Sequence, residues 1–358
     1  MPCSAKAATL AGEDGIASVS TAGSGHPSLP RAGAARGQLL IGLGDLAGGP
    51  FESVASAVSD DGSVVVGESI GSISQYEIGR SAVRWTLAGD VVTGMASLGW
   101  LAPSSHESHA YAVSSDGGIV AGTSTDPADS LAFRWTQADG MRRIEDLAGG
   151  MVRSSGLGVS DAGRVVGECY DAGGAKACFA DEEQFATLAD PFSAPITGSA
   201  EAITPDGVFV AGTRDTQEGR EAFRWSATDL ARGEGAITEL GDLEGGAFAS
   251  TAHAISDDGS TVVGSSEVGG GTEAFRWTEA GGIVSLGDLP GGSVNAVATA
   301  ASADGSLIVG RANDASGSRA FAWDAAHGMR HLTDLLDDRG VETTGWRSGG
   351  TAPRHQDR

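Results

Sequence analysis

Residues 240–289 read LGDLEGGAFASTAHAISDDGSTVVGSSEVGGGTEAFRWTEAGGIVSLGDL, and this stretch decides the fold. It contains an L-G-D-L-x-G-G segment, an alternating S-x-A-x-A segment, an Asp-Gly turn, a Val-Val-Gly segment and an A-F-R-W-T segment, before L-G-D-L returns. The same order recurs along the chain, so the turn glycine marks each copy. These glycines are Gly62, Gly117, Gly163, Gly207, Gly259 and Gly305, separated by 55, 46, 44, 52 and 46 residues. Periods of this length indicate propeller blades or another repeat array.

The alternating segment predicts a strand that packs closely against a neighbour. Residues 53–58 alternate with period two, and small residues recur at the same two positions of every copy, on what we expect to be one face of the strand. A position that stays small indicates tight packing near a propeller axis or between stacked sheets. The pairs are Ala55 and Ala57, Ala110 and Ala112, Gly156 and Gly158, Ala200 and Ala202, Ala252 and Ala254, and Ala298 and Ala300.

Three further segments complete a four-stranded unit. Asp-Gly between apolar runs predicts a hairpin turn, and the consecutive valines that follow predict a strand buried on both faces. The next segment places two large apolar residues on one side of a strand, which predicts the core between blades. We expect L-G-D-L, as in residues 43–46 and 286–289, to supply the fourth strand. The apolar pairs are Val83 and Trp85, Phe133 and Trp135, Phe223 and Trp225, Phe275 and Trp277, and Phe321 and Trp323.

The predicted fold is therefore all-β, a β-propeller of four-stranded blades. The 56 glycines and the period-two pattern exclude helical arrays, and solenoid coils are usually shorter than this repeat. Six blades can be drawn, or seven with the last one incomplete, because residues 331–335 resemble the start of another copy. We expect a disordered or linker-like segment at 1–37, the propeller at 38–340 and an irregular tail at 341–358.

The composition of the chain limits the classes of binding partner. The 358 residues carry 47 acidic and 23 basic side chains, a formal net charge of −24. A field of this sign repels phosphate backbones and anionic lipids, so we expect no nucleic-acid partner. No apolar run is long enough to span a bilayer, so we also expect no membrane insertion. Glu13 and Asp14 interrupt the segment in which a secretory signal would need uninterrupted apolar residues.

The motif string resembles the HAF family of probable extracellular bacterial repeats. The likeness covers about residues 40 to 340 and is fullest in residues 240–289. It implies a secreted or surface-displayed β-repeat protein, some members lying in autotransporter-like chains, with no assigned reaction or catalytic residue to carry over. The chain departs from the pattern in its third unit and at residues 98–101, where Trp100 replaces the aspartate of L-G-D-L.

Cys169 and Cys178 are a candidate disulfide. They flank Gly173 and Gly174, and a two-residue Gly-Gly turn would place the cysteines opposite each other on a non-hydrogen-bonded rung, within disulfide range. The third unit also carries Asp181 where we expect the tryptophan of other units, so a crosslink would replace lost packing. Two buried thiols are the alternative. Cys3 is expected to be unpaired in the tail.

Other polar patterns predict structure rather than chemistry. The aspartates of L-G-D-L could form a carboxylate ring, but capping of the following turn explains them better; they are Asp45, Asp146, Asp190, Asp242, Asp288 and Asp334. The arginines beside each tryptophan are expected to form weak strand-to-strand ion pairs; they are Arg84, Arg134, Arg224 and Arg276. His106 and His109 do not complete a zinc site, and no catalytic motif, metal site or cofactor site is predicted.

These observations favour a non-catalytic, monomeric interaction or display module outside the cell or at its surface, with an unknown protein or glycan ligand. The variable insertions at 70–79 and 228–234 are the expected contact surface, on one rim. A polysaccharide-active hydrolase or lyase with its site at the propeller mouth is the alternative. A third hypothesis is that the chain is a truncated fragment of a larger surface protein.

Overall fold

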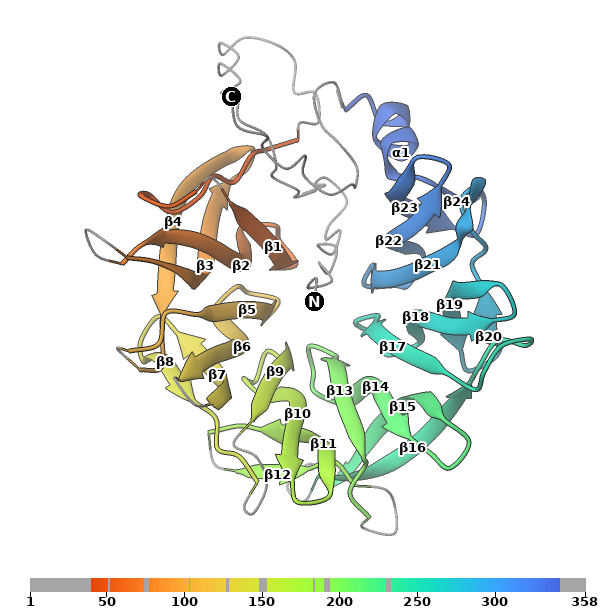
Figure 1. Ribbon diagram of the computed structural model, residues 1–358, viewed down its shortest axis with the longest axis horizontal. Helices are drawn as coiled ribbons and strands as arrows, with labels where there is room; N and C mark the ends of the chain where they lie inside the picture. Colours follow the sequence, from red (N-terminus) through yellow and green to blue (C-terminus); the bar gives the residue numbers. More distant parts are fainter. Residues whose placement is uncertain are drawn as a thin grey trace.

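A computed structural model describes residues 40–341 apart from 51, 74–76, 103, 127–128, 148–152, 183, 190–193 and 230–232. The segment predicted at 1–37 and, apart from Val341, the tail predicted at 341–358 lie outside the described residues. The described part contains 24 strands and one short helix, and the strands form six antiparallel blades of four around a common axis (Figure 1). The prediction of an all-β propeller with six four-stranded blades is confirmed.

The first three blades follow the order of the chain. Blade 1 consists of β1 (Ser53–Val58), β2 (Val64–Ser72), β3 (Ile78–Ala88) and β4 (Val91–Gly99). Blade 2 consists of β5 (Ser108–Val113), β6 (Ile119–Asp126), β7 (Asp129–Thr136) and β8 (Gly140–Arg143). Blade 3 consists of β9 (Ser154–Val159), β10 (Val165–Asp171), β11 (Gly174–Ala180) and β12 (Phe185–Thr187).

The last three blades repeat the same plan, and a helix follows them. Blade 4 consists of β13 (Gly198–Ile203), β14 (Phe209–Asp215), β15 (Arg220–Asp229) and β16 (Glu234–Gly241). Blade 5 consists of β17 (Ser250–Ile255), β18 (Thr261–Val268), β19 (Gly271–Thr278) and β20 (Gly282–Ser285). Blade 6 consists of β21 (Gly291–Ala301), β22 (Leu307–Asp314), β23 (Gly317–Asp324) and β24 (Gly328–His331), and α1 (Leu332–Asp338) comes next.

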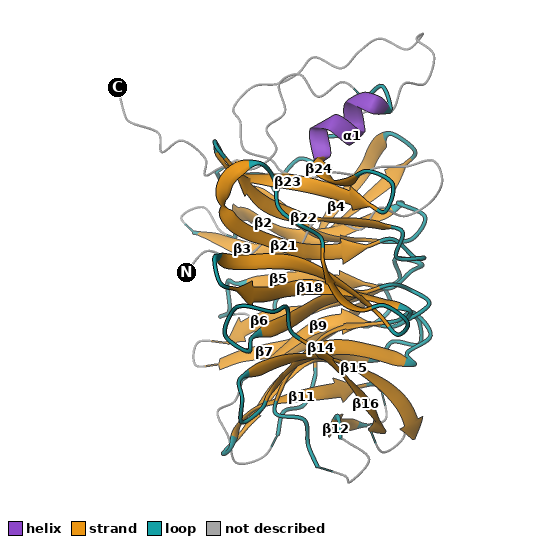
Figure 2. Cartoon of the chain, turned by 90° about the vertical axis from the view of Figure 1, so that its right-hand side faces the viewer, coloured by secondary structure: helices purple, strands orange, loops and turns teal. Residues whose placement is uncertain are grey.

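The first strand of each blade lies nearest the axis and the fourth lies at the outside (Figure 1). Strand ends and loops gather on two opposite faces, which are seen edge-on in Figure 2. The turn face carries the tight turns between first and second strands. Because successive strands are antiparallel, the loops between second and third strands lie on the other face, which we call the hairpin face.

Apolar side chains fill the junctions between blades. Phe275 and Trp277 of blade 5 pack with Ala211 and Ala222 of blade 4. The consecutive valines behave as predicted, since Val262 faces blade 4 and Val263 faces blade 6, and both are fully buried. Clusters of the same kind join blades 1 and 2, blades 3 and 4, and blades 5 and 6, with a smaller one between blades 2 and 3.

The paired small residues of the innermost strands face opposite sides, not one side as the period-two pattern predicted. A β-bulge shifts the register between Ala252 and Ala254. As a result Ala252 packs in the cluster with blade 4, whereas Ala254 packs against the cluster with blade 6. The innermost strand therefore packs closely against both neighbouring blades near the axis, which explains why both positions stay small.

A buried serine joins consecutive blades at three junctions. Ser250 opens β17 and accepts a hydrogen bond of 2.9 Å from the backbone N–H of Ala222 in blade 4. Its hydroxyl donates to the carbonyl of Gly241, at 2.6 Å. Ser108 makes the same pair of contacts with Ala82 and Gly99, and Ser154 accepts from Ala132. The serine of S-x-A-x-A therefore satisfies backbone groups that the sheets leave unpaired.

L-G-D-L does not supply the whole fourth strand, contrary to the prediction: its first two residues end β16 at Leu240 and Gly241, and the fourth strands otherwise precede it. In blade 5 the fourth strand is Gly282–Ser285, and the motif follows it as the crossover to blade 6. The N–H of Leu286 donates to the carbonyl of Ala274 on β19, at 2.9 Å, and the side chain of Leu286 is buried. The leucine anchors the crossover, and the glycine after it has a positive φ of 81° that ends the extended backbone.

The junction between blades 6 and 1, here called the seam, differs from the other five. Its apolar residues form two separate clusters, one on blade 1 around Val65, Val83 and Trp85, and one on blade 6 around Val309. Figure 1 shows a wider arc between these blades than between the others. Within the described residues, no bridge between backbones joins blade 6 to blade 1.

Residues 331–335 do not open a seventh blade. His331 ends β24, and Leu332–Asp338 forms α1, whose Leu335 packs on Val309 and Ala322 of blade 6. Leucines at positions 332, 335 and 336 follow helical spacing, so the segment buries an apolar stripe against the last blade. No helix in the described ranges has the length and apolar character needed to cross a membrane.

Candidate functional site

The Asp-Gly turns build the rim of the turn face. In blade 5 the hydroxyl of Ser256 donates to Asp258, at 2.6 Å, and the backbone N–H of Ser260 donates to the same carboxylate, at 2.9 Å. Gly259 completes the turn with a φ of 69°. Equivalent bonds hold the carboxylates of Asp61, Asp116, Asp206 and Asp304 in their own turns. These second turn residues are structural.

The first turn residue behaves differently, and it is an aspartate only in blades 1, 3 and 5. Asp60, Asp161 and Asp257 alternate with Ser115, Pro205 and Ala303 of the other blades. We call Asp60, Asp161 and Asp257 the axial aspartates. The backbone N–H of each donates to the carbonyl of the first turn residue in the next blade, at 2.9–3.1 Å. Neighbouring turns are thereby locked together, and this fixes the axial aspartates around the mouth of the ring.

The three carboxylates are close enough to affect one another. Burial, followed by the charges of Asp60 and Asp161 and then Asp258, raises the pKa of Asp257 to about 6. The negative charge of Asp161 is partly compensated, because its carboxylate accepts a hydrogen bond of 2.8 Å from the N–H of Ser115. Within the described part of the chain, no three His, Cys, Asp or Glu side chains are placed to hold a metal ion.

Two turn aspartates are expected to affect stability in opposite directions. The pKa of Asp257 in the folded state, about 6, lies above its ordinary value of 3.8, so its ionisation destabilises the fold progressively as pH rises through that window. We expect Asp257→Asn to raise the melting temperature at neutral pH by roughly 2 °C, with the gain absent below about pH 4. Thermal unfolding across this pH range measures the difference.

Asp304→Asn is the matched control. Hydrogen bonds from Ser302 and then the backbone of Ser306 lower the pKa of Asp304 to about 2, so its carboxylate stabilises the fold above pH 3.8. Asparagine should therefore lower the melting temperature at neutral pH. Equal effects of the two substitutions would show that the axial aspartate is no more strained than a capping one.

The aspartates of L-G-D-L do not form a ring at the axis. Asp146, Asp242 and Asp288 lie in crossovers that follow outermost strands, and Asp45 lies in the segment that leads into β1. In two of the crossovers a carboxylate caps the next residue, since Asp146 and Asp288 accept the N–H of Leu147 and Leu289 at 2.8 and 2.9 Å. Asp334 lies in α1, and Asp190 lies outside the described residues.

Three of the four arginines beside tryptophans, Arg84, Arg134 and Arg224, reach the next blade, so the pairing predicted between strands runs across blade junctions. Arg224 on β15 donates to the carbonyl of Gly259 in the turn of blade 5, at 3.0 Å, and its guanidinium lies 4.9 Å from the ring centre of Trp277. Arg84 donates to Gly117 of blade 2 at 3.3 Å. Arg134 pairs with Glu182 of blade 3. These arginines are mostly buried, so the turn face presents mainly carboxylates.

The two cysteines of blade 3 are bonded in the structure, with Cα atoms 6.1 Å apart. The predicted register was wrong by two residues. The hairpin loop is Ala172 and Gly173, so Cys178 lies opposite Gly167, and Cys169 lies opposite Lys176. The cysteines are diagonal neighbours on one face. Ala180, not Asp181, occupies the register position of the tryptophan, opposite Val165.

We expect the protein from an oxidising compartment to contain this disulfide. Its intact mass should be about 2 Da lower without reductant than with it, because one bond replaces two thiol hydrogens. Mass spectrometry of protein recovered without reductant, after blocking free thiols, checks this. Two blocked thiols at Cys169 and Cys178 would reject the disulfide and favour the alternative of buried thiols.

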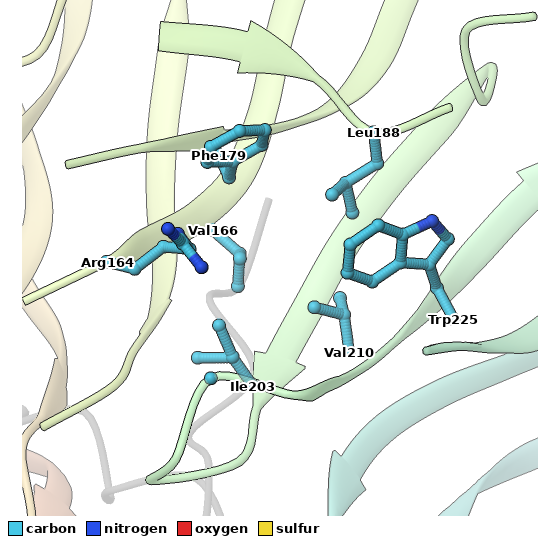
Figure 3. A pocket seen from close by; sticks show the side chains of 8 residues that line it. Arg164, Val166, Phe179, Leu188, Ile203, Val210 and Trp225 are labelled. Atoms are coloured by element: carbon cyan, nitrogen blue, oxygen red, sulfur yellow. The ribbon is translucent and has the colours of Figure 1, made fainter. Parts of the chain in front are cut away.

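A hollow lies at the junction of blades 3 and 4, and Figure 3 shows the side chains around it. Phe179, Leu188 and Trp225 line it with Val166, Val210 and Ile203, and Arg164 stands at one edge. Phe179 occupies the position that arginine holds in other blades. Apart from Arg164 the lining side chains are apolar, so this hollow is a small packing defect and not a binding site.

The remaining predicted sites do not converge. The ring of His106 packs edge-on against Trp100, while His109 bonds to Glu68 and Glu107, so the two histidines share no ligand position. The two variable insertions lie on different faces, contrary to the prediction of one rim. Residues 70–79 join β2 to β3 on the hairpin face, and residues 228–234 join β15 to β16 on the turn face. Residues 74–76 and 230–232 lie outside the described residues.

Comparison with known proteins bears on the fold alone. No family model matches the sequence, and no curated protein matches it. Among solved structures, the chain is similar to the β-propeller domain of the Trilobed protease from Pyrococcus furiosus, which is described as having an open velcro topology. The two are 12% identical with a TM-score of 0.51, covering 79% of this chain and 84% of that one. This likeness supports the propeller.

Two TolB structures are more distant. The putative TolB from Agrobacterium tumefaciens is 15% identical with a TM-score of 0.46, over 67% of this chain and 84% of that one. TolB from Acinetobacter baumannii is 13% identical with a TM-score of 0.44, over 68% of this chain. The chain spans 57% of the length of the Acinetobacter protein.

Proposed function

We propose that this propeller is a non-catalytic interaction module that acts outside the cell or at its surface and binds a basic protein partner on its turn face. The observation that carries the proposal is the placement of Asp60, Asp161 and Asp257 around the axial mouth. Burial, followed by the charges of Asp60 and Asp161, raises the pKa of Asp257 to about 6. Ionised Asp257 destabilises the folded chain, and a carboxylate kept at such a cost is explained by a role in binding a partner.

The rest of the turn face supports a cationic partner. Its exposed side chains are dominated by carboxylates, whereas its arginines point between the blades. A formal net charge of −24 would speed the approach of a basic partner. The exposed acidic residues of this face are Asp60, Asp61, Asp90, Asp116, Asp139, Asp161, Glu182, Asp206, Asp258, Glu279 and Asp304. The resemblance to the HAF family supports a location outside the cell.

A lysine decapeptide, titrated by calorimetry at about 0.15 M salt, tests the site without the natural partner. The test variant carries Asp60→Asn, Asp161→Asn and Asp257→Asn. The control removes three exposed carboxylates from the hairpin face by Glu77→Gln, Glu218→Gln and Glu267→Gln, so both variants change the net charge from −24 by 3, to −21. We expect the turn-face variant to bind about tenfold more weakly and the control to bind within about twofold of the parent. Equal losses would mean that only net charge matters and would contradict the proposal.

An enzyme acting on polysaccharide is the second candidate, and one cluster on the hairpin face favours it. Burial raises the pKa of Glu168, which bonds to Tyr170 and feels the charge of Glu201 from blade 4. A carboxyl group with a raised pKa beside a second carboxylate is the arrangement used for acid–base catalysis on glycosidic bonds. Turnover of acidic or neutral polysaccharides that is lost in Glu168→Gln would favour this function over the interaction module.

A further inference from the structure

Among the described residues, blade 1 shares an apolar cluster and backbone bridges with only one other blade, blade 2. The cluster of blade 1 around Val65, Val83 and Trp85 stays separate from that of blade 6, and no backbone bridge crosses the seam among the described residues. On its other side, blade 1 shares a continuous apolar cluster with blade 2, where Val66 and Ala82 pack with Phe133. The junction between blades 1 and 2 therefore decides how firmly the first blade is held.

A charged network lies in this junction. His109 on the innermost strand of blade 2 points one ring nitrogen, Nδ1, at Glu68 on β2 of blade 1. The other nitrogen, Nε2, lies 3.2 Å from Glu107. Arg80 on β3 bonds to the same Glu68, at 2.5 Å, and to Glu52, at 3.1 Å. The side chains of His109 and Glu68 are only 13% and 14% exposed, so water screens their attraction weakly.

The charged groups around His109 come from blade 1 and from its own blade. From blade 1, β2 contributes Glu68, β3 contributes Arg80, and Glu52 precedes β1. From blade 2, Glu107 precedes β5 and Tyr111 stacks on the imidazole, with ring centres 6.0 Å apart. On β6, Thr123 is the residue paired with His109. The one titratable residue of β6 is Asp126, at the end of that strand, and β9 contains none. Two carboxylates thus bond directly to the imidazole.

The network favours a charged histidine. Burial disfavours the imidazolium, but the hydrogen bond and charge of Glu68, and then those of Glu107, outweigh it and raise the pKa of His109 above 6.5. Burial likewise opposes ionisation of Glu68, yet His109 and Arg80 outweigh it and lower the pKa of Glu68 below 4.5. Protonated His109 and ionised Glu68 therefore stabilise each other, and the interaction is fully present between these two ordinary values.

We propose that Glu68, His109 and Glu107 form a pH-sensitive latch that holds blade 1 on blade 2. When the pH rises through the pKa of His109, the imidazole loses its charge and one of its two N–H donors, so the ion pairs with Glu68 and Glu107 and one of the two hydrogen bonds are lost. Glu68 then keeps its ion pair with Arg80 of its own blade, and the junction between the blades is weakened to its backbone bonds and apolar contacts. Blade 1, which has no second blade neighbour among the described residues, becomes the part of the ring that opens first.

Blade 5 offers a matched control. His253 also lies on an innermost strand, but its Nε2 lies 3.2 Å from the hydroxyl of Ser265 within its own blade. Ser265 lies on β18 of the same blade, and His253 is not part of the network of Glu68, His109 and Glu107. His253→Gln therefore removes a histidine from an innermost strand without touching the latch.

Amide hydrogen exchange of the full chain, corrected for intrinsic chemical rates, tests the latch at about pH 5.5 and about pH 8.5. We expect β1 to β4 of the parent to exchange about tenfold faster, after correction, at the higher pH, while the strands of blades 3 to 5 change little. In His109→Gln, blade 1 should exchange at the faster rate at both pH values. The control His253→Gln should keep the pH dependence of the parent.

A pH-independent blade 1 in the parent, or an unchanged pH dependence in His109→Gln, would overturn the proposal. If His109→Gln does not fold, Glu107→Gln takes its place, since the side chain of Glu107 is 54% exposed and contributes only part of the stabilisation. The latch then requires the midpoint of the exchange transition to move to lower pH. A midpoint that stays where it is would also overturn the proposal.

Discussion

Replacing Gly264 with alanine is expected to lower the free energy of unfolding by at least about 3 kcal/mol. Gly264 is the glycine of Val-Val-Gly in blade 5, and it has no positive φ that would require glycine. A Cβ atom there would collide with the carbonyl of Thr251 on the innermost strand and would lie 2.9 Å from the ring of Phe275. Both neighbours are held by the sheet, so neither can move aside cheaply.

Gly42→Ala is the control for this substitution. A Cβ atom at Gly42 meets nothing within 4 Å, and no positive φ occurs there. Urea unfolding should show a change within about 0.5 kcal/mol for Gly42→Ala. A similarly small change for Gly264→Ala would mean that the innermost strand does not press on β18 as described.

Removing the guanidinium of Arg224 is expected to cost about 2–4 kcal/mol of unfolding free energy. Arg224→Ala leaves the carbonyl of Gly259 without its buried partner and removes the cation–π contacts with Phe209 and Trp277, at 5.0 and 4.9 Å. The pair with Glu279 adds little, because that carboxylate is 81% exposed. The loss should therefore depend only weakly on salt.

Arg142→Ala is the matched comparison for Arg224→Ala. Arg142 is 67% exposed and pairs with Asp139 on the same face, so its removal should change stability by less than about 0.5 kcal/mol. Denaturant unfolding of both variants at low and high salt separates the two cases. Equal losses of unfolding free energy in the two variants, or a loss at Arg224 that vanishes in high salt, would show that Arg224 forms only a weak surface ion pair.

The repeat made the fold predictable from sequence. A strand of alternating small residues, an Asp-Gly turn, consecutive valines and a pair of large apolar residues each correspond to one feature of the blade. Val262, Val263 and Phe275 lie in the inter-blade clusters as their pattern predicted. Burial patterns of this kind depend on neighbours along one strand, which the sequence displays directly.

Features that depend on bulges and register were not predictable. The bulge between Ala252 and Ala254 turns one of them to each side and brings the carbonyl of Thr251 over Gly264. A shift of two residues in the hairpin of blade 3 left the cysteine pair on one face, although it is diagonal. Residues 331–335 resembled the start of another repeat in sequence, but the spacing of the leucines at 332, 335 and 336 favoured a helix.

The axial aspartates were hidden for a different reason. Asp60, Asp161 and Asp257 lie in turns with ordinary turn chemistry, and nothing local separates them from the capping aspartates beside them. The sequence signal was that the first turn residue is aspartate in every second blade. This pattern indicates a cluster only when the blades are known to surround one axis. Likewise, His109 and Glu68 lie 41 residues apart and meet only through the packing of two blades.

The central claim is that the blades wrap around one axis and bring Asp60, Asp161 and Asp257 together at its mouth. Carbon-detected NMR of the aspartate carboxyl groups, with Asp257→Asn used for assignment, measures the pKa of Asp257 directly. We expect a value of about 6 that falls when Asp60 and Asp161 are both changed to asparagine. A value near 3.8, or one that does not respond to those two substitutions, would contradict the convergence of the three blades.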